Sequence, residues 1–287
     1  MTEGFCLTED PSNPGVMYAG GVRKFGSVFK MCVLKTENGG MTWRPTRSLP
    51  VSGSQYSYDV GCRDIAVAPS DSNIVYAVGD EGPDWSEHYG EVCRSSDGGD
   101  SWEDITSNLS KLLPGQGNSS DPYSNRWFLP AVLVYPNDSS RVLVGSNRGV
   151  FETRDAGETW TATSFRDSVK DLAYDPTRNI LFAATENNGV FFSEDNGETW
   201  NEMNDGLTSM RCLCLAVDSK NGFLFVGTYG GAACRIALPD VKLLLSRSFS
   251  PENYRVGRPG VVTLLPQLEA GDQLDSLVIE EILPEGV

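Results

Sequence analysis

Histidine is almost absent from this sequence of 287 residues, in which His88 is the only one. A Ser-His-Asp triad could draw only on that single imidazole, and a metal site built from several histidines is excluded. The sequence also contains no Cys-x-x-Cys pair, so the ligand spacing of a zinc ribbon is missing. We therefore expect no metal site and no cofactor.

Basic residues and long apolar runs are also scarce. The 23 Lys and Arg residues face 39 Asp and Glu residues, which gives a formal net charge of −16. Such a charge repels phosphate backbones and anionic lipid surfaces, so we expect no nucleic-acid partner. No stretch approaches the roughly 18 consecutive apolar residues of a membrane span, and the first residues lack the features of a signal peptide. We expect no membrane insertion, while the hydrophobic content of 39% suffices for a packed core.

The seven cysteines form an odd-numbered set without the compact spacing of a disulfide framework. Most of them alternate with apolar residues in strand-like runs, as Cys212 and Cys214 do. Because unpaired cysteine is among the most buried residue types, we interpret them as small core side chains. This interpretation leaves the redox compartment open.

Four segments of eight residues align without gaps on the pattern [S/T]-x-[D/N]-x-G-x-[S/T]-W. They cover residues 36–43, 95–102, 153–160 and 193–200. Each segment follows an alternating or apolar run, which in turn follows a Pro/Asp turn and another β-rich run. Their tryptophans are 59, 58 and 40 residues apart, and the shortest step gives the length of the bare unit. A unit of about 40 residues with four short strands has the length of a β-propeller blade.

The residue types in this pattern are those of a tight hairpin turn. A short Asp or Asn side chain accepts backbone N–H bonds, Gly supplies the positive φ, and the Ser or Thr hydroxyls close the hairpin ends. The Trp enters the next strand and packs between sheets, where it buries on the order of 200 Å². We therefore assign structural roles to the motif residues, which are Asn38, Gly40, Trp43, Asp97, Gly99, Trp102, Asp155, Gly157, Trp160, Asp195, Gly197 and Trp200.

These segments resemble the Asp-box, or BNR repeat, of sialidases, two-propeller xyloglucanases, sortilin-type receptors and a photosystem assembly factor. The resemblance implies that the box lies on the outer rim of a propeller, between the third and fourth strands of a blade and away from the ligand-binding mouth. A fifth unit, with strand-like runs at 212–218 and 224–231, has no box. The five units span about residues 5–50, 58–108, 127–165, 167–206 and 208–238.

The predicted fold class is all-β, a β-propeller of four-stranded blades with five visible units. Either a small ring closes with these units, or they belong to a six- or seven-bladed ring with blades upstream. After residue 240 the blade pattern is lost, and alternating runs between Pro and Gly turns predict three short strands. This segment resembles the opening of a β-sandwich module of large secreted bacterial proteins. We expect a propeller domain at 1–240, followed by a partial sandwich or linker at 241–287.

Two insertions carry the candidate ligand-binding residues. The first, residues 79–90, is expected between the third and fourth strands of the second unit, and the second, residues 112–127, joins the second and third units. Long loops are often functional, and sugar sites combine flat aromatic faces with carboxylates, as these insertions do. The candidate residues are Asp80, Asp84, Trp85, Glu87, His88, Tyr89, Tyr123 and Trp127. In the alternative interpretation, Trp85 and Trp127 anchor the loops and the acids are merely solvated.

The sequence favours a non-catalytic binding or scaffolding propeller within a longer secreted or cell-surface bacterial protein. We expect a monomeric propeller with a glycan, or a protein surface, as its partner, and we assign no catalytic residue. The alternative is a glycoside hydrolase fragment resembling the two-propeller xyloglucanases, in which the catalytic acids lie on two separate propellers. A sialidase is disfavoured because no Arg-Ile-Pro segment occurs. The photosystem factor uses a basic face, whereas this chain is acidic.

Overall fold

The computed structural model of the chain describes residues 3–47, 49–50, 61–81, 89–113, 127–231, 233–239, 244–248 and 263–267. Its regular structure is almost entirely antiparallel β-sheet, and five sheets use the strands in chain order. The first sheet holds β1 (Glu3–Glu9), β2 (Met17–Phe25), β3 (Val28–Thr36) and β4 (Arg44–Pro45). The second holds β5 (Gly61–Ala68), β6 (Asp71–Glu81), β7 (Tyr89–Ser95) and β8 (Glu103–Asp104).

The remaining sheets repeat this plan. The third holds β9 (Ala131–Tyr135), β10 (Asp138–Ser146), β11 (Gly149–Thr153) and β12 (Thr161–Ala162). The fourth holds β13 (Val169–Asp175), β14 (Ile180–Thr185), β15 (Val190–Ser193) and β16 (Asn201–Glu202). The fifth has three strands, β17 (Cys212–Asp218), β18 (Phe223–Thr228) and β19 (Cys234–Ala237). A short helix, α1 (Thr106–Ser110), follows β8.

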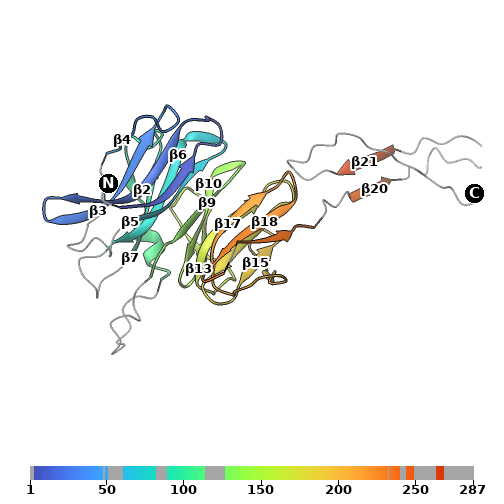
Figure 1. Cartoon of the computed structure of the whole chain (residues 1–287). Helices are drawn as coiled ribbons and strands as arrows, with labels where there is room; N and C mark the ends of the chain where they lie inside the picture. Colours follow the sequence, from blue (N-terminus) through green and yellow to red (C-terminus); the bar gives the residue numbers. More distant parts are fainter. Residues whose placement is uncertain are drawn as a thin grey trace, which may run out of the picture.

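The five sheets stand side by side in chain order, from the blue first sheet to the orange fifth sheet in Figure 1. Their first strands form the contacts between neighbours, with β1 beside β5, β5 beside β9, β9 beside β13 and β13 beside β17. Each sheet is therefore an up-and-down unit of the kind found in propeller blades. The predicted all-β fold of repeated four-stranded units is confirmed.

Burial differs between the inner and the end sheets. Every residue of β9, β11 and β14 is buried, because these strands have a sheet on each side. In the end sheets, β1 has no buried residue and β17 has one, and apolar side chains stay accessible, such as Leu7 at 65% and Phe225 at 40%. Among the described residues, the first and fifth sheets do not pack on each other as neighbouring sheets do.

An aspartate shapes the first hairpin of every sheet. Its carboxylate accepts a backbone N–H two or three residues later at 2.9–3.0 Å, which holds the tight turn between the first and second strands. The five aspartates are Asp10, Asp71, Asp138, Asp175 and Asp218. This repeated turn explains why a Pro/Asp signal precedes the second β-rich run in the sequence.

The first insertion lies at a different hairpin from the one predicted. Strand β6 continues to Glu81 and β7 begins at Tyr89, so residues 82–88, which lie outside the described residues, connect the second and third strands of the second sheet. The third and fourth strands are joined by the eight-residue motif 95–102 instead. Gly79 and Asp80, which read as loop residues in the sequence, are paired with Cys62 and Gly61 of β5.

Beyond the fifth sheet, β20 (Leu244–Ser248) and β21 (Thr263–Gln267) pair with each other in a separate two-stranded sheet. The third strand predicted for this region lies outside the described residues. In the described part of the chain, no helix has the length and apolar character of a membrane span.

Candidate functional site

The four motif segments, here called Trp turns, share one hydrogen-bond pattern. The hydroxyl of the first residue donates to Oδ1 of the third at 2.7–2.9 Å, and the same Oδ1 accepts the backbone N–H of the seventh at 2.7–2.9 Å. The glycine N–H donates back to the first hydroxyl at 2.8–3.1 Å. The side-chain oxygens of the third residues, an amide oxygen in Asn38 and carboxylate oxygens in Asp97, Asp155 and Asp195, are thus engaged in holding the turn.

Backbone conformation explains the glycine of each Trp turn. The fifth residue is always Gly and has φ between 86° and 100°, and the fourth residue also lies in the left-handed region, at 60° to 67°. The fourth position is Gly in two turns but is Ala156 and Asn196 in the others. Two consecutive left-handed residues are favourable mainly for Gly, which is why the motif requires it.

The hydrogen bonds keep the turn carboxylates ionised. Donation by the Thr199 and Ser193 hydroxyls and the Thr199 backbone N–H lowers the pKa of Asp195 to about 2. The pKa of Asp155 is lowered in the same way by Thr159 and Thr153. At Asp97, desolvation opposes the effect, but bonds from Ser101 and Ser95 still lower the pKa to about 2. A general acid needs a raised pKa, so the turn carboxylates are unsuited to that role.

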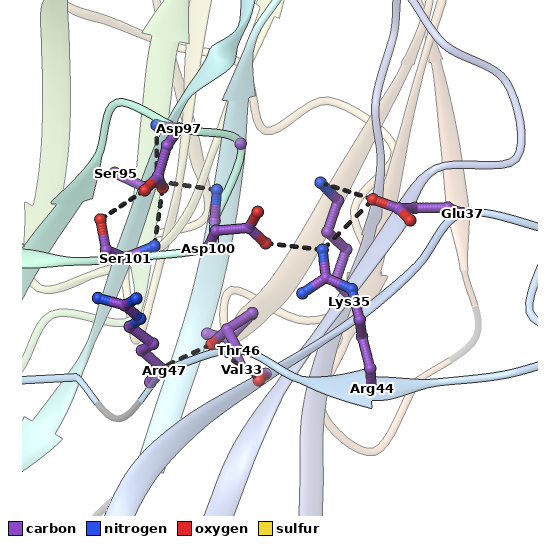
Figure 2. Close-up of polar contacts among 12 residues, drawn as sticks. Val33, Lys35, Glu37, Arg44, Thr46, Arg47, Ser95, Asp97, Asp100 and Ser101 are labelled. Atoms are coloured by element: carbon purple, nitrogen blue, oxygen red, sulfur yellow. Dashed lines mark hydrogen bonds and ion pairs between the residues drawn. The ribbon is translucent and has the colours of Figure 1, made fainter.

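The second, third and fourth Trp turns also contact the preceding sheet, as Figure 2 shows for the second turn and the first sheet. The Arg44 guanidinium of the first sheet lies 2.6 Å from Asp100 of the turn and 3.3 Å from Glu37, which also pairs with Lys35. The Trp102 indole N–H donates to Thr46 at 3.2 Å. In three turns, the backbone carbonyl of the sixth residue accepts a hydrogen bond from the segment that follows the preceding sheet. The donors are the Arg47 backbone N–H to Asp100, the Asn108 side-chain amide to Glu158 and the Ser164 hydroxyl to Glu198.

The burial of each motif tryptophan follows from these contacts between sheets. Trp160 is 5% exposed and packs in a core cluster that includes residues of the second sheet and α1. Trp102 and Trp200 are half-buried, and Trp200 lies 4.8 Å from Phe165 between ring centroids. Trp43 is 36% exposed, which corrects the expectation that every motif Trp is buried between sheets. The first turn has no preceding sheet among the described residues against which Trp43 could pack.

Asp80 of the first insertion is buried and bound within the fold. Its carboxylate lies 2.7 Å from Nε of Arg63 and accepts the backbone N–H of Leu129 at 3.3 Å. Arg63 in turn stacks over the ring of Phe5 at 4.5 Å. Asp80 therefore links β6 to the segment that enters the third sheet, and a ligand would not meet it directly in this arrangement.

Trp127 ends the second insertion and is only 2% exposed. A Cβ added at Gly90 would lie 2.7 Å from the Trp127 ring and 2.5 Å from Leu129, so the ring is seated closely against β7. Trp127 thus performs the anchoring role of the alternative interpretation. Because Gly90 is the last residue of the first insertion, the ends of the two insertions lie together beside the start of β7.

The other candidate residues lie outside the described residues. These are Asp84, Trp85, Glu87, His88 and Tyr123, together with the side chain of Tyr89, whose backbone pairs with Glu81. Their ligand contacts stay predictions. The described flanks bring the ends of both insertions together, which sequence separation alone did not reveal.

A groove that the sequence did not suggest lies between the third and fourth sheets. It has a volume of about 270 Å³ and is lined by Ser164, Phe165, Arg166, Asp167, Phe191 and Trp200. Phe165 packs edge-on against Phe191 at 5.1 Å between ring centroids. In the sequence, the only sign of this groove is the run Phe165, Arg166 and Asp167 shortly after the third Trp turn. A search for repeated motifs does not find it, because the run does not recur in the other units.

Two further aspartates connect neighbouring sheets through their first strands. Asp64 of β5 accepts the backbone N–H of Val132 in β9 at 2.9 Å, and Asp171 of β13 accepts that of Leu215 in β17 at 2.7 Å. Desolvation raises the pKa of Asp64 to about 7 and that of Asp171 to about 6, although these N–H bonds oppose the shift. They were not among the predicted site residues.

No protein-family model matches the chain. The xyloglucanase Xgh74A of Acetivibrio thermocellus is 30% identical to it over 125 residues. The alignment covers 42% of this chain and 14% of that protein, so the chain spans a small part of its relative.

Solved structures share the fold. The GH74 enzyme of Niastella koreensis matches with a TM-score of 0.52 at 17% identity, over 78% of this chain and 33% of that one. YCF48 from Cyanidioschyzon merolae matches with a TM-score of 0.52 at 14% identity, over 92% and 71%. At such identities the likeness shows a propeller-like β fold and nothing about activity.

Proposed function

We propose that the chain is a non-catalytic binding or scaffolding propeller of a larger secreted or cell-surface bacterial protein, and that its ligand is a glycan. The observation that carries the proposal is that the two insertions meet at their ends. Trp127 packs on Gly90, and the Leu129 backbone N–H donates to the Asp80 carboxylate. The fold thereby holds the ends of two aromatic- and acid-rich segments together beside the start of β7.

The similarity to a xyloglucanase supports a polysaccharide as the ligand class. A protein that binds such a polysaccharide meets it outside the cell, so we propose an extracellular or cell-surface location. The shared hydrogen bonds and left-handed glycines support the identification of the four Trp turns as Asp-boxes. The separate β20–β21 sheet supports a domain boundary near residue 240, with a partial sandwich or linker after it.

A binding role is favoured over hydrolysis by the state of the motif and candidate carboxylates that the structure describes. Glycoside hydrolysis needs two carboxyls about 5 to 10 Å apart, one of them a proton donor to the leaving group. The Trp-turn aspartates hold turns, and Asp80 is paired with Arg63. The alternative, a glycoside hydrolase fragment, is favoured by the xyloglucanase similarity. The raised pKa of Asp64 and Asp171 would suit a general acid, but each of these carboxylates accepts a backbone N–H of the next sheet.

A glycan array probed with the purified chain tests the proposal, and calorimetry with xyloglucan oligosaccharides quantifies any binding. We expect Trp85→Ala to weaken binding by roughly 5- to 150-fold, the worth of about 1 to 3 kcal/mol of aromatic stacking. Asp84→Asn should weaken it less, because the amide keeps an acceptor for a sugar hydroxyl. Trp43→Ala, which removes an exposed Trp of the first sheet, is the matched control and should bind normally.

Other outcomes would redirect the proposal. Full affinity in Trp85→Ala would show that the ligand does not bind at the first insertion, and the groove at Phe165 and Trp200 would be tested next. Equal, salt-sensitive losses in both variants would indicate a cationic ligand instead of a glycan. Release of reducing ends from polysaccharides by the isolated chain would contradict the non-catalytic assignment.

A further inference from the structure

Two cysteines from neighbouring sheets face each other across a glycine. Cys6 lies in β1 opposite Gly20 of β2, and Cys62 lies in β5 of the second sheet. A Cβ placed on Gly20 would lie 2.4 Å from Sγ of Cys6 and 2.7 Å from Sγ of Cys62. The two sulfur atoms are therefore no farther apart than about 5 Å. The missing side chain of Gly20 provides the space in which they meet.

The surroundings of the two thiols differ. Cys62 is fully buried, and its Sγ donates to the Asp64 carbonyl at 3.6 Å. Cys6 is half-buried, and its Sγ donates to the Cys62 carbonyl at 3.7 Å. Burial, followed by the nearby Cys6 thiol, raises the pKa of Cys62 well above its usual range. Cys6 is thus the thiol that a reagent in solution meets first, and Cys62 is held behind it as the second partner.

The two cysteines lie on strands that contact each other. Strands β1 and β5 are the first strands of adjacent sheets and lie side by side. A disulfide spans Cα atoms about 4.4 to 6.8 Å apart, so neighbouring strands can accept one when the side chains turn toward each other. Both side chains already point at Gly20, so rotation of the two side chains is the motion that would bring their sulfur atoms together.

We propose that Cys6 and Cys62 are a redox-active thiol pair, which a low-molecular-weight disulfide such as oxidised glutathione converts into a disulfide between the first and second sheets. The Cys6 thiolate attacks one glutathione sulfur, which forms a mixed disulfide and releases one reduced glutathione. The Cys62 sulfur then attacks Cys6 and expels the second glutathione, which takes up the Cys62 proton. Two protein thiols are oxidised, and one oxidised glutathione becomes two reduced molecules.

The disulfide would secure the first sheet, which lies at one end of the array. The first sheet has a neighbour on one side only among the described residues, and its outer side leaves Leu7 and Trp43 exposed. An inter-sheet disulfide would close the chain between residues 6 and 62 and restrict its unfolded state. The end sheet of the array would then be held covalently to the second sheet in an oxidising environment.

The fifth sheet supplies an internal comparison. It holds three cysteines, of which Cys212 donates to the Ser209 carbonyl at 3.9 Å and Cys234 contacts the Thr208 hydroxyl at 3.6 Å. Cys214 is exposed and faces Gly227 of its own sheet. None of these contacts brings a thiol of one sheet to a thiol of another, so we expect Cys6 and Cys62 to pair first.

Peptide mapping of the full chain tests the proposal directly. The chain is incubated with oxidised glutathione, its free thiols are blocked with N-ethylmaleimide, and it is digested with trypsin without reduction. Cleavage places Cys6 in peptide 1–23, Cys32 in 31–35, Cys62 in 48–63 and Cys93 in 64–94, so each pairing gives a distinct mass. We expect a cross-linked species of peptides 1–23 and 48–63 that dithiothreitol abolishes, and a thiol count that falls from seven to five.

Thermal unfolding tests the stabilising role. The oxidised chain should melt several degrees above the reduced chain, and Cys6→Ser should lose this difference whereas Cys93→Ser should keep it. Maleimide labelling of Cys6 after oxidation, or a dominant cross-link between other peptides, would overturn the pairing. The expected cross-link without a rise in melting temperature would overturn its role in securing the first sheet.

Discussion

The four motif tryptophans have the same sequence surroundings but different environments. Trp160 is 5% exposed in a cluster with Leu109 and Leu113, whereas Trp43 is 36% exposed. We predict that Trp160→Ala lowers the free energy of unfolding by about 3 to 5 kcal/mol, the cost of deleting a large buried aromatic. Trp43→Ala should cost less than about 1 kcal/mol. Denaturant titration of both variants measures the difference, and similar losses would show that burial does not decide the effect.

The turn aspartates should matter for stability and not for ligand affinity. Asp195→Ala removes the acceptor of the Thr199 N–H and of two hydroxyls, so we predict a lower melting temperature with unchanged binding per folded molecule. Asp155→Ala should behave in the same way. Glu194→Ala removes one negative charge from an exposed position of the same turn and is the control. Lost binding at unchanged melting temperature would instead make the aspartate a ligand residue.

At the scale of the turn, two glycines with the same conformation have different neighbours. Gly157 has φ +100°, and an added Cβ would lie 2.4 Å from Cδ1 and 3.1 Å from Cβ of Ile105. Gly197 has φ +91°, but its Cβ would meet nothing closer than 3.7 Å. We predict that Gly197→Ala costs about 1 to 3 kcal/mol from backbone strain alone. Gly157→Ala should cost a further 1 to 3 kcal/mol or so from overpacking.

Equilibrium unfolding of these two alanine variants separates backbone strain from contact between sheets. Equal losses would mean that Ile105 moves aside without cost. A larger loss for Gly157→Ala would show that the turn is fitted to the preceding sheet, since Ile105 belongs to the segment that follows β8.

The elements of the fold were largely predictable because one pattern recurs. The pattern located the connections between third and fourth strands and indicated four units, and strand-like runs without the motif indicated the fifth. The insertion at residues 79–90 was assigned to the wrong hairpin because Gly79 and Asp80 have the composition of a loop. They pair with β5 nonetheless, since Arg63 compensates the buried Asp80 carboxylate. A charge partner 17 residues away is invisible to local propensity.

At the scale of the whole molecule, the position of a sheet in the array decides what its residues do. Every residue of β9 and β14 is buried, whereas in the end sheets β1 has no buried residue and β17, although it is almost as apolar, has only one. The sequence shows which residues are apolar but not which sheet lies beside them, so it could not predict that Trp43 is exposed. For the same reason, it could not predict that Trp127 is seated on Gly90, because that contact joins two sheets.

The coupling between sheets should respond to pH through Asp64 and Asp171. Each carboxylate bonds a backbone N–H of the next sheet, Val132 for Asp64 and Leu215 for Asp171. Desolvation, with a smaller contribution from the charge of Asp171, raises the pKa of Asp64 to about 7 in the folded chain, above the 3.8 of a free side chain. The folded state therefore binds the proton more tightly than the unfolded state does.

The sign of the effect follows from linkage. The stability that Asp64 contributes is complete below about pH 4 and is lost as pH rises through about 7. The Trp-turn carboxylates have the opposite sign, but their lowered pKa places their effect between about pH 4 and 2. We therefore predict that the melting temperature rises as pH falls from 8 to 5, and that Asp64→Asn, which keeps an acceptor but cannot ionise, flattens this slope. Glu194→Gln, at an exposed position, should leave the slope unchanged. Calorimetric scans of the three proteins across this range measure it, and a wild-type slope retained in Asp64→Asn would show that the carboxyl does not titrate between the sheets.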